Sequence, residues 1–242
     1  FVCGGGLALA LLLAFVLYKR KRDAVARQRD AEFGALVADT ELKALRAQLN
    51  PHFIFNSLNS ISDYIAKNDR EIAQEYLARF AHLMRQALEN TDKKEVLLAD
   101  DLSFTELYLK MEVKRLGGKF AYAIHVDERI DPENTLVPPL LLQPFVENSI
   151  WHGFARKESG GYIRIRIKKE GNMLTCTVID NGQRLRQGLV RHNQQSMGIR
   201  LTETRLAIQN REKQTNGRLT VTNRKEGSGV LVKISLPLEQ AF

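Results

Sequence analysis

A histidine follows a proline in the run Gln-Leu-Asn-Pro-His-Phe-Ile-Phe-Asn at residues 48–56. Apolar residues recur at helical spacing on both sides of Pro51, where a proline bends a helix and frees a backbone carbonyl. His52 lies on the flank of the apolar stripe, so its ring can reach solvent, and Asn56 stands one turn on, where it can orient that ring. A lone histidine on a helix is more often structural than catalytic, but this context favours a chemical role for His52.

A second group of polar residues interrupts the apolar run Val-Pro-Pro-Leu-Leu-Leu-Gln-Pro-Phe-Val-Glu-Asn-Ser-Ile-Trp-His-Gly at residues 137–153. The leucines alone indicate a buried helix, which is a purely structural interpretation. Glu147 would be costly to bury without a partner, and Asn148 and His152 are four residues apart and share one helix face. Such a face suits a polar cleft for phosphates and Mg²⁺, because Mg²⁺ prefers oxygen ligands such as the Asn148 carbonyl.

Two glycine-containing turns follow. The run Val-Ile-Asp-Asn-Gly at residues 178–182 ends a predicted strand, and its plain interpretation is an ordinary turn. In a binding site, Asp180 would accept a hydrogen bond from an adenine amino group, and Gly182 would let the backbone approach the base. Gly198 stands at the start of a predicted helix, where backbone N–H groups can bind phosphate, although one glycine is weak evidence by itself.

The net charge of +8 is concentrated in one short segment. Residues 19–29 hold six basic side chains and one acidic side chain, which gives +5 and leaves +3 for the rest of the chain. Residues 1–18 hold no charge, and an apolar run before a basic segment is typical of a transmembrane helix with a cytoplasmic flank. We therefore expect a membrane segment rather than nucleic-acid binding. Because the chain begins with Phe, we also expect it to be a fragment.

The elements that must position these residues begin with helices. Residues 19–41 are polar, rich in alanine and without proline, which favours a helical linker. Residues 42–118 hold two amphipathic helices joined by a turn at Asn68-Asp69, then a helix at about 100–116 that ends at Gly117-Gly118. Two helical hairpins make a four-helix bundle, so we expect residues 42–118 to form the dimerisation and phosphoacceptor region of a homodimer.

After Gly118 the apolar pattern changes from helical spacing to alternation, which is typical of half-buried strands. The last half of the chain therefore mixes strands with helices, and we expect an α/β sandwich over residues 119–242 with helices on one face of a sheet. The predicted fold class is mixed: a transmembrane helix, a helical hairpin and this sandwich. Strands are expected at 120–126, 163–167, 174–178 and 230–236, and helices near 139–152 and 198–212.

These motifs, in this order, resemble those of the LytS-type sensor histidine kinases from about residue 40 to the end of the chain. The runs around His52 and Asn148 are specific to that family, and the two glycine motifs are not. The resemblance implies that His52 is the phosphoacceptor, that Asn148 is a Mg²⁺ ligand and that Asp180 contacts adenine. It also implies an ATP-binding domain with the fold of gyrase, Hsp90 and MutL, in which Gly182 and Gly198 belong to the nucleotide loops.

The resemblance implies a two-component sensor histidine kinase in the bacterial inner membrane, with its main domains in the cytoplasm. In such a protein ATP phosphorylates His52, and the phosphoryl group passes to an aspartate of a response regulator. A helical hairpin offers too little core alone, which also favours a homodimer. A linker pattern of the family is matched by Tyr108, Glu112 and Arg115, without a definite role.

Two positions depart from the family pattern. Arg184 and Ser196 stand where the family commonly has glycine, and a Cβ restricts the backbone at such positions. We expect strain at Arg184, so that Arg184→Gly tightens ATP binding by up to about tenfold. Two alternatives stay open: a membrane-tethered scaffold that binds nucleotide without phosphorylating, and a gyrase-like ATP hydrolase. The basic residues Arg184, Arg186, Arg191 and His192 form either a lid over the phosphates or a solvated loop.

Overall fold

The computed structural model describes residues 15–25, 51–90, 93–184 and 197–242. Residues 15–25 are helical. Most of the predicted membrane segment 1–18 and linker 19–41 lies outside the described residues. Within the described residues, no helix is both long and apolar enough to cross a membrane. The chain divides into two units, residues 1–42 and 43–242, and every element named below belongs to the second unit.

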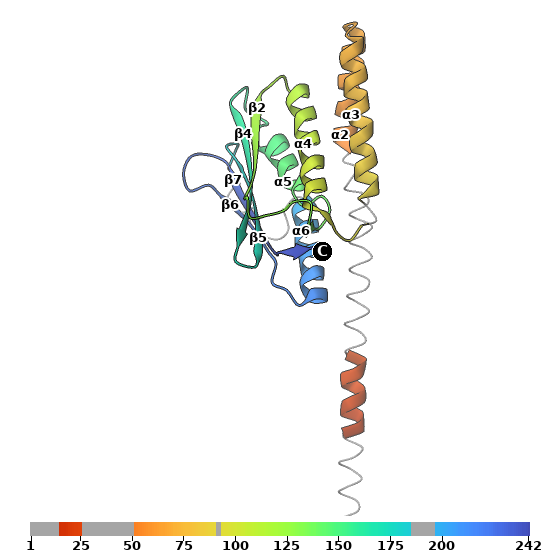
Figure 1. Ribbon diagram of the computed structural model, residues 1–242, viewed down its shortest axis with the longest axis vertical. Coiled ribbons are helices and arrows are strands. Elements are labelled where there is room, and N and C mark those ends of the chain that lie inside the picture. Colours follow the sequence, from red (N-terminus) through yellow and green to blue (C-terminus); the bar gives the residue numbers. More distant parts are fainter. Residues whose placement is uncertain (1–14, 26–50, 91–92, 185–196) are drawn as a thin grey trace, which may run out of the picture. The chain divides into compact units, whose positions relative to one another are not determined.

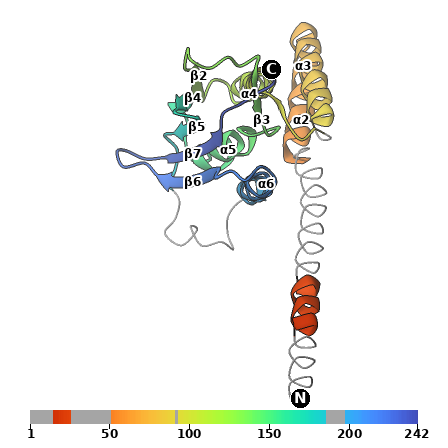
Figure 2. The ribbon, with the colours of Figure 1, turned by 60° about the horizontal axis from the view of Figure 1, so that its bottom comes forward.

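The predicted helical hairpin is confirmed. Helices α2 (Pro51–Ala66) and α3 (Arg70–Glu89) lie side by side and run in opposite directions (Figures 1 and 2). Asn68 between them has a φ of 62°, a left-handed conformation that asparagine adopts more readily than most residues. One face of each helix is buried. The buried apolar side chains are Phe53 and Ile61 on α2, and Ala73, Tyr76, Leu83 and Ala87 on α3.

Five strands form the main sheet in the order β2-β4-β5-β7-β6. Strand β2 is parallel to β4, and the other neighbours are antiparallel. On β4, Ile163, Ile165 and Ile167 are fully buried, whereas the side chains between them face the other way, as the alternation predicts. The strands are β2 (Phe120–Val126), β4 (Gly161–Glu170), β5 (Met173–Asp180), β6 (Arg218–Asn223) and β7 (Val230–Pro237). A smaller antiparallel sheet holds β1 (Val96–Leu97), β3 (Thr135–Val137) and β8 (Glu239–Gln240).

Three helices cover one face of the main sheet (Figures 1 and 2). They are α4 (Leu98–Arg115), α5 (Gln143–Asn148), which continues into the π-helical turn η1 (Ser149–Gly153), and α6 (Met197–Lys213). The predicted α/β sandwich is thereby confirmed. The helix predicted at 139–152 is wrong at its start, because residues 139–142 are not helical and Leu140 has a φ of 56°.

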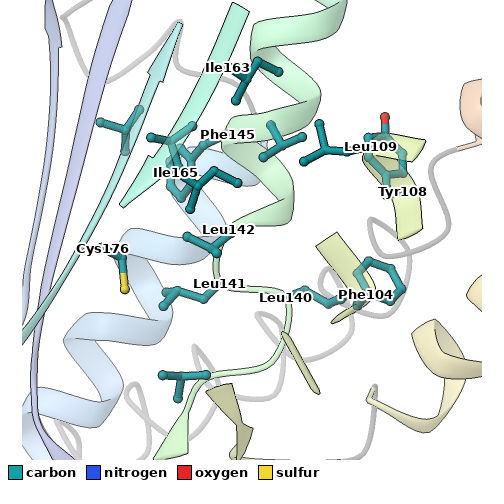
Figure 3. Close-up of a cluster of buried hydrophobic side chains, with 14 of the residues drawn as sticks. Phe104, Tyr108, Leu109, Leu140, Leu141, Leu142, Phe145, Ile163, Ile165 and Cys176 are labelled. Atoms are coloured by element: carbon teal, nitrogen blue, oxygen red, sulfur yellow. The ribbon is translucent and has the colours of Figure 1, made fainter. Parts of the chain in front are cut away.

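The core of the sandwich lies between the helices and the sheet (Figure 3). It is built by Phe104, Tyr108 and Leu109 from α4, Leu140–Leu142 and Phe145 from the α5 region, and Ile163, Ile165 and Cys176 from the sheet. Burial raises the pKa of the Cys176 thiol, so this cysteine is a packing residue. Helix α4 packs on α3 of the hairpin as well as on β2, β3 and α5. The predicted domain boundary at residue 118 stays a prediction.

Candidate nucleotide site

Two side chains fix the loop that leads into α5. Asp101 of α4 is fully buried, and its Oδ1 accepts the Leu141 N–H at 3.1 Å. Arg205 of α6 donates from Nη1 to the Pro139 carbonyl at 2.9 Å. Between these contacts Leu140 holds its left-handed backbone, which costs a non-glycine residue about 1–3 kcal/mol. Neighbouring elements therefore set where α5 begins, and with it the position of Asn148.

Asn148 and His152 lie on either side of an unusual backbone turn. Asn148 is the last residue of α5 and is half-buried, whereas His152 is exposed. The Phe154 N–H donates to the Ser149 carbonyl at 3.0 Å, a spacing of five residues that defines a π-turn. Such turns are rare and occur often at functional sites. The predicted shared face of Asn148 and His152 assumed an uninterrupted α-helix, and that assumption is wrong.

Asp180 ends β5 and points into the same region. It is 4% exposed, and its Oδ1 accepts N–H groups from Gly182 at 2.7 Å and Val230 at 3.3 Å. Its Oδ2 lies 3.0 Å from the Ser149 Oγ. Burial raises the pKa of Asp180, and the hydrogen bonds from Gly182 and Ser149 oppose that rise. The carboxyl group is thus oriented on one side by backbone and on the other by a hydroxyl.

The hydroxyl of Ser149 has more acceptors than hydrogens. Its Oγ lies 2.9 Å from the Phe145 carbonyl and 3.0 Å from the Asp180 Oδ2, but a serine carries one hydrogen. When Ser149 donates its hydrogen to the Phe145 carbonyl, it donates none to the Oδ2 of the buried Asp180 carboxylate. An amino group from outside the protein would supply the missing hydrogen bond, and an adenine carries such a group. The arrangement therefore fits the adenine contact predicted for Asp180.

Two glycine backbones touch beside this carboxylate. A Cβ on Gly182 would lie 2.5–2.6 Å from the backbone of Gly153, closer than such atoms are ever found. The Gln183 N–H donates to the Gly153 carbonyl at 2.9 Å and holds the two segments together. Gly182 is therefore required by contact with the turn η1, whereas its approach to a base stays a prediction.

The remaining predicted residues lie elsewhere in the chain. His52 is the second residue of α2, and its side chain is outside the described set. Asn56 is half-buried one turn on, and its carbonyl accepts the Ser60 hydroxyl at 2.9 Å. Gly198 lies in the first turn of α6, which packs against α5. The structure thus brings Asn148, His152, Asp180 and Gly182 together around η1 and places His52 and Asn56 in the hairpin. Ser196 and the remaining lid residues Arg186, Arg191 and His192 lie outside the described residues.

The strain expected at Arg184 is absent. Among described non-glycine residues, only Asn68, Leu140 and Gln214 have a positive φ, so the backbone at Arg184 does not require glycine. Its guanidinium is exposed and donates to the Gly227 carbonyl from Nη2 at 2.6 Å and from Nε at 3.2 Å. The physical basis for tighter ATP binding in Arg184→Gly is therefore wrong.

Three residues of the site were not assigned from sequence. Ser149 and Gly153 stand inside the motif at 137–153, but a serine in an apolar helix and a glycine at its end read as ordinary packing and capping residues. Asp101 belongs to a helix distant in sequence, and its hydrogen bond to Leu141 spans 40 positions. Only the folded chain shows these three contacts.

Comparison with known proteins finds similarity to histidine kinases. Residues 40–120 match the histidine kinase family. LytS of Staphylococcus aureus strain MRSA252, a sensor histidine kinase/phosphatase, is 38% identical over 149 residues, which are 61% of this chain and 25% of that protein. LytS of strain Mu50 is 37% identical over the same length. The chain thus spans about a quarter of the length of these relatives.

Solved structures of histidine kinases are also similar to the chain. The kinase domain of the blue-light-activated EL346 from Erythrobacter litoralis covers 87% of this chain and 94% of its own length, with a TM-score of 0.47 and 18% identity. ThkA in complex with the response regulator TrrA covers 92% of this chain and 66% of its own, with a TM-score of 0.43 and 16% identity. Scores of this size carry no argument about function. Residues 40–120 of the chain thus match the histidine kinase family, and a stretch of 149 residues is similar in sequence to LytS sensor histidine kinases.

Proposed function

We propose that the chain is the kinase part of a two-component sensor, in which ATP with Mg²⁺ phosphorylates His52. The γ-phosphorus would leave the bridging oxygen of ADP and bond to a ring nitrogen of His52, and an aspartate of a response regulator would then accept the phosphoryl group. This chemistry depends mainly on positioning and on neutralising charge. In this proposal Asp180 binds the adenine and Asn148 binds Mg²⁺. His152, Gly182 and Gly198 contribute to nucleotide binding.

The Asp180 carboxylate is the observation that carries this proposal. It is buried, its Oδ1 is saturated by two backbone N–H groups, and its Oδ2 shares one hydrogen with the Phe145 carbonyl. A buried carboxylate with incomplete hydrogen bonding is expensive unless a ligand completes it. The amino group of adenine can donate the missing hydrogen bond. The carbonyl that guanine carries in the same position would repel the carboxylate. The site therefore favours adenine over guanine.

The chain's residues fit Mg²⁺ only together with phosphates. Within the described residues no three side chains of His, Cys, Asp or Glu come together as a metal site. Mg²⁺ commonly uses few protein ligands and takes the rest from phosphates and water, so one Asn148 carbonyl is sufficient. In Asn148→Ala we expect Mg²⁺ to lose its effect on ATP affinity while the fold is kept. Calorimetric titration with and without Mg²⁺ measures this, and an unchanged Mg²⁺ effect would make Asn148 a structural residue.

The proposal includes a homodimer joined through the hairpin. Large apolar side chains on it remain exposed in the single chain, including Phe55 at 66%, Ile65 at 61% and Leu88 at 55%. Exposed apolar side chains of this size on one pair of helices are typical of an interface.

We further propose that residues 1–18 anchor the dimer in the bacterial inner membrane, with the kinase region in the cytoplasm.

Transfer of label from γ-labelled ATP to the protein tests the function. We expect acid-labile label in the wild type, none in His52→Gln, and normal label in the control His82→Gln, because His82 is exposed on α3 and outside the motif. Both variants should bind ATP like the wild type. ATP binding without label would favour the scaffold, and release of free phosphate without phosphohistidine would favour the hydrolase. Label that persists in His52→Gln would overturn the assignment of the acceptor.

A further inference from the structure

Helix α4 carries a buried ion pair that the fold alone does not explain. Glu112 is fully buried, and its two carboxylate oxygens accept the Arg115 Nε at 2.8 Å and Nη2 at 2.6 Å. A planar guanidinium that meets a carboxylate with two parallel hydrogen bonds is held in one orientation. Buried ion pairs are seldom more stabilising than apolar side chains of the same size. A pair that is kept buried therefore points to a role in orientation.

The guanidinium of Arg115 lies over a ring of the turn η1. Its Cζ is 4.6 Å from the centre of the Trp151 ring, and Trp151 lies in η1 between Asn148 and His152. The two hydrogen bonds to Glu112 fix the orientation of the guanidinium that lies over this ring. Arg115 thus contacts the turn whose Ser149 and Gly153 touch Asp180 and Gly182.

The same helix contacts the hairpin next to the phosphoacceptor. Tyr108, one turn before Glu112, has its ring 5.0 Å from the ring of Phe53, which follows His52 directly. Tyr76 of α3 is fully buried nearby, and its pKa is raised first by burial and further by the Glu112 carboxylate. Helix α4 therefore joins the hairpin to the turn η1 through adjacent side chains.

We propose that Arg115, oriented by Glu112, is a positioning residue that holds η1 in the geometry needed for ATP and couples that turn to helix α2. This inference rests on the proposed kinase function and assigns to it two residues of α4 that lie outside the motifs proposed to hold the nucleotide and the phosphoacceptor. Arg115 acts through Trp151, and Glu112 acts through Arg115. A lysine in place of Arg115 would keep the positive charge beside Glu112 but lose the fork and the stacking face.

Substitution of Arg115 in the 242-residue chain tests the inference. In Arg115→Lys we expect KM for ATP in the labelling reaction to rise by about 5- to 20-fold, about 1–2 kcal/mol. The emission of Trp151, the chain's single tryptophan, should change without nucleotide, because the guanidinium leaves the ring. Glu112→Gln should change both quantities in the same direction. The control is Arg129→Lys, which breaks a similar two-bond pair with Asp127 on an exposed loop and should change neither.

The outcomes separate this inference from the proposed function. A purely structural ion pair would lower the melting temperature of Arg115→Lys and could alter Trp151 emission, but KM for ATP of the folded protein would stay at the wild-type value, and that KM overturns the inference. Equal effects of Arg115→Lys and Arg129→Lys on KM overturn it as well. A wild type that neither binds ATP nor becomes labelled overturns the proposed function and this inference with it, before any variant is compared.

Discussion

Addition of one methyl group at Gly182 should disable the nucleotide site. The Cβ of Gly182→Ala would lie 2.5 Å from the Gly153 Cα and 2.6 Å from its carbonyl carbon and oxygen, whereas ordinary contact begins near 3.4 Å. The two backbones must therefore separate by about 0.9 Å, which is 3.4 minus 2.5. Because both are backbone segments, no side-chain rotation can relieve the clash.

The expected size of the effect follows from overpacking. Insertion of a methyl group into a packed region costs about 1–3 kcal/mol. Displacement of η1 also moves Ser149 away from Asp180, so part of this free energy appears as lost affinity. We expect Kd for ATP to rise at least about tenfold, which is 1.4 kcal/mol. Melting should occur about 2–4 °C lower for each kcal/mol lost from folding.

The facing glycine provides a matched control. A Cβ on Gly153 would meet the Asp180 Oδ1 at 3.5 Å and the Gly182 Cα at 3.6 Å, which are ordinary contacts. Gly153→Ala should therefore affect affinity and melting much less than Gly182→Ala. Titration with a fluorescent ATP analogue and thermal unfolding of both variants measure the difference. Equal affinities in the two variants would refute the argument from contact distance.

Three further expectations follow from the same contacts. Asp180→Asn keeps the size of the side chain but loses the acceptor at Oδ2, so ATP affinity should fall at least about tenfold while GTP affinity, measured by competition, hardly changes. Burial raises the pKa of Asp101 to about 7. The pKa of an aspartate in an unfolded chain is roughly 3.9, so between these two values the folded state binds a proton at Asp101 that the unfolded state does not. The contribution of this proton to the free energy of unfolding is therefore lost as pH rises through about 7. Urea unfolding at pH 5 and 8 should show a fall of about 2–3 kcal/mol that is absent in Asp101→Asn. Arg184→Gly removes only exposed hydrogen bonds to Gly227, so its Kd for ATP should stay within about threefold of the wild type, and a tenfold tighter complex would restore the strain hypothesis.

Apolar periodicity was sufficient to predict most elements of the fold. The alternation of Ile163, Ile165 and Ile167 predicted a half-buried strand, and the left-handed turn at Asn68 stood where the sequence predicted the end of α2. Strand β6 was missed because only two apolar residues, Leu219 and Val221, mark its alternation and most of its residues are exposed. The short strands β1, β3 and β8 hold two or three residues each, too few for any period to be recognised.

The site was predictable in its residue types and not in its geometry. The spacing of Asn148 and His152 suggested one helix face, but no propensity scale anticipates a π-turn between them. Leu140 could not be read as left-handed, because its backbone is held by Asp101 and Arg205, which are distant in sequence. The expectation at Arg184 fails for a different reason: a family preference for glycine does not by itself require a positive φ, and the backbone of Arg184 has none.

The hydrogen bond from Val230 to Asp180 has a consequence for the order in which parts of the chain can fold during synthesis on the ribosome. Both helices of the hairpin are complete by Glu89, and their contacts with each other are local, so they can form while the rest of the chain is still being made. Asp180 receives its second N–H only when β7 has emerged, fifty residues after Asp180 itself. The hairpin that carries His52 can therefore form well before Asp180 receives both of its backbone hydrogen bonds.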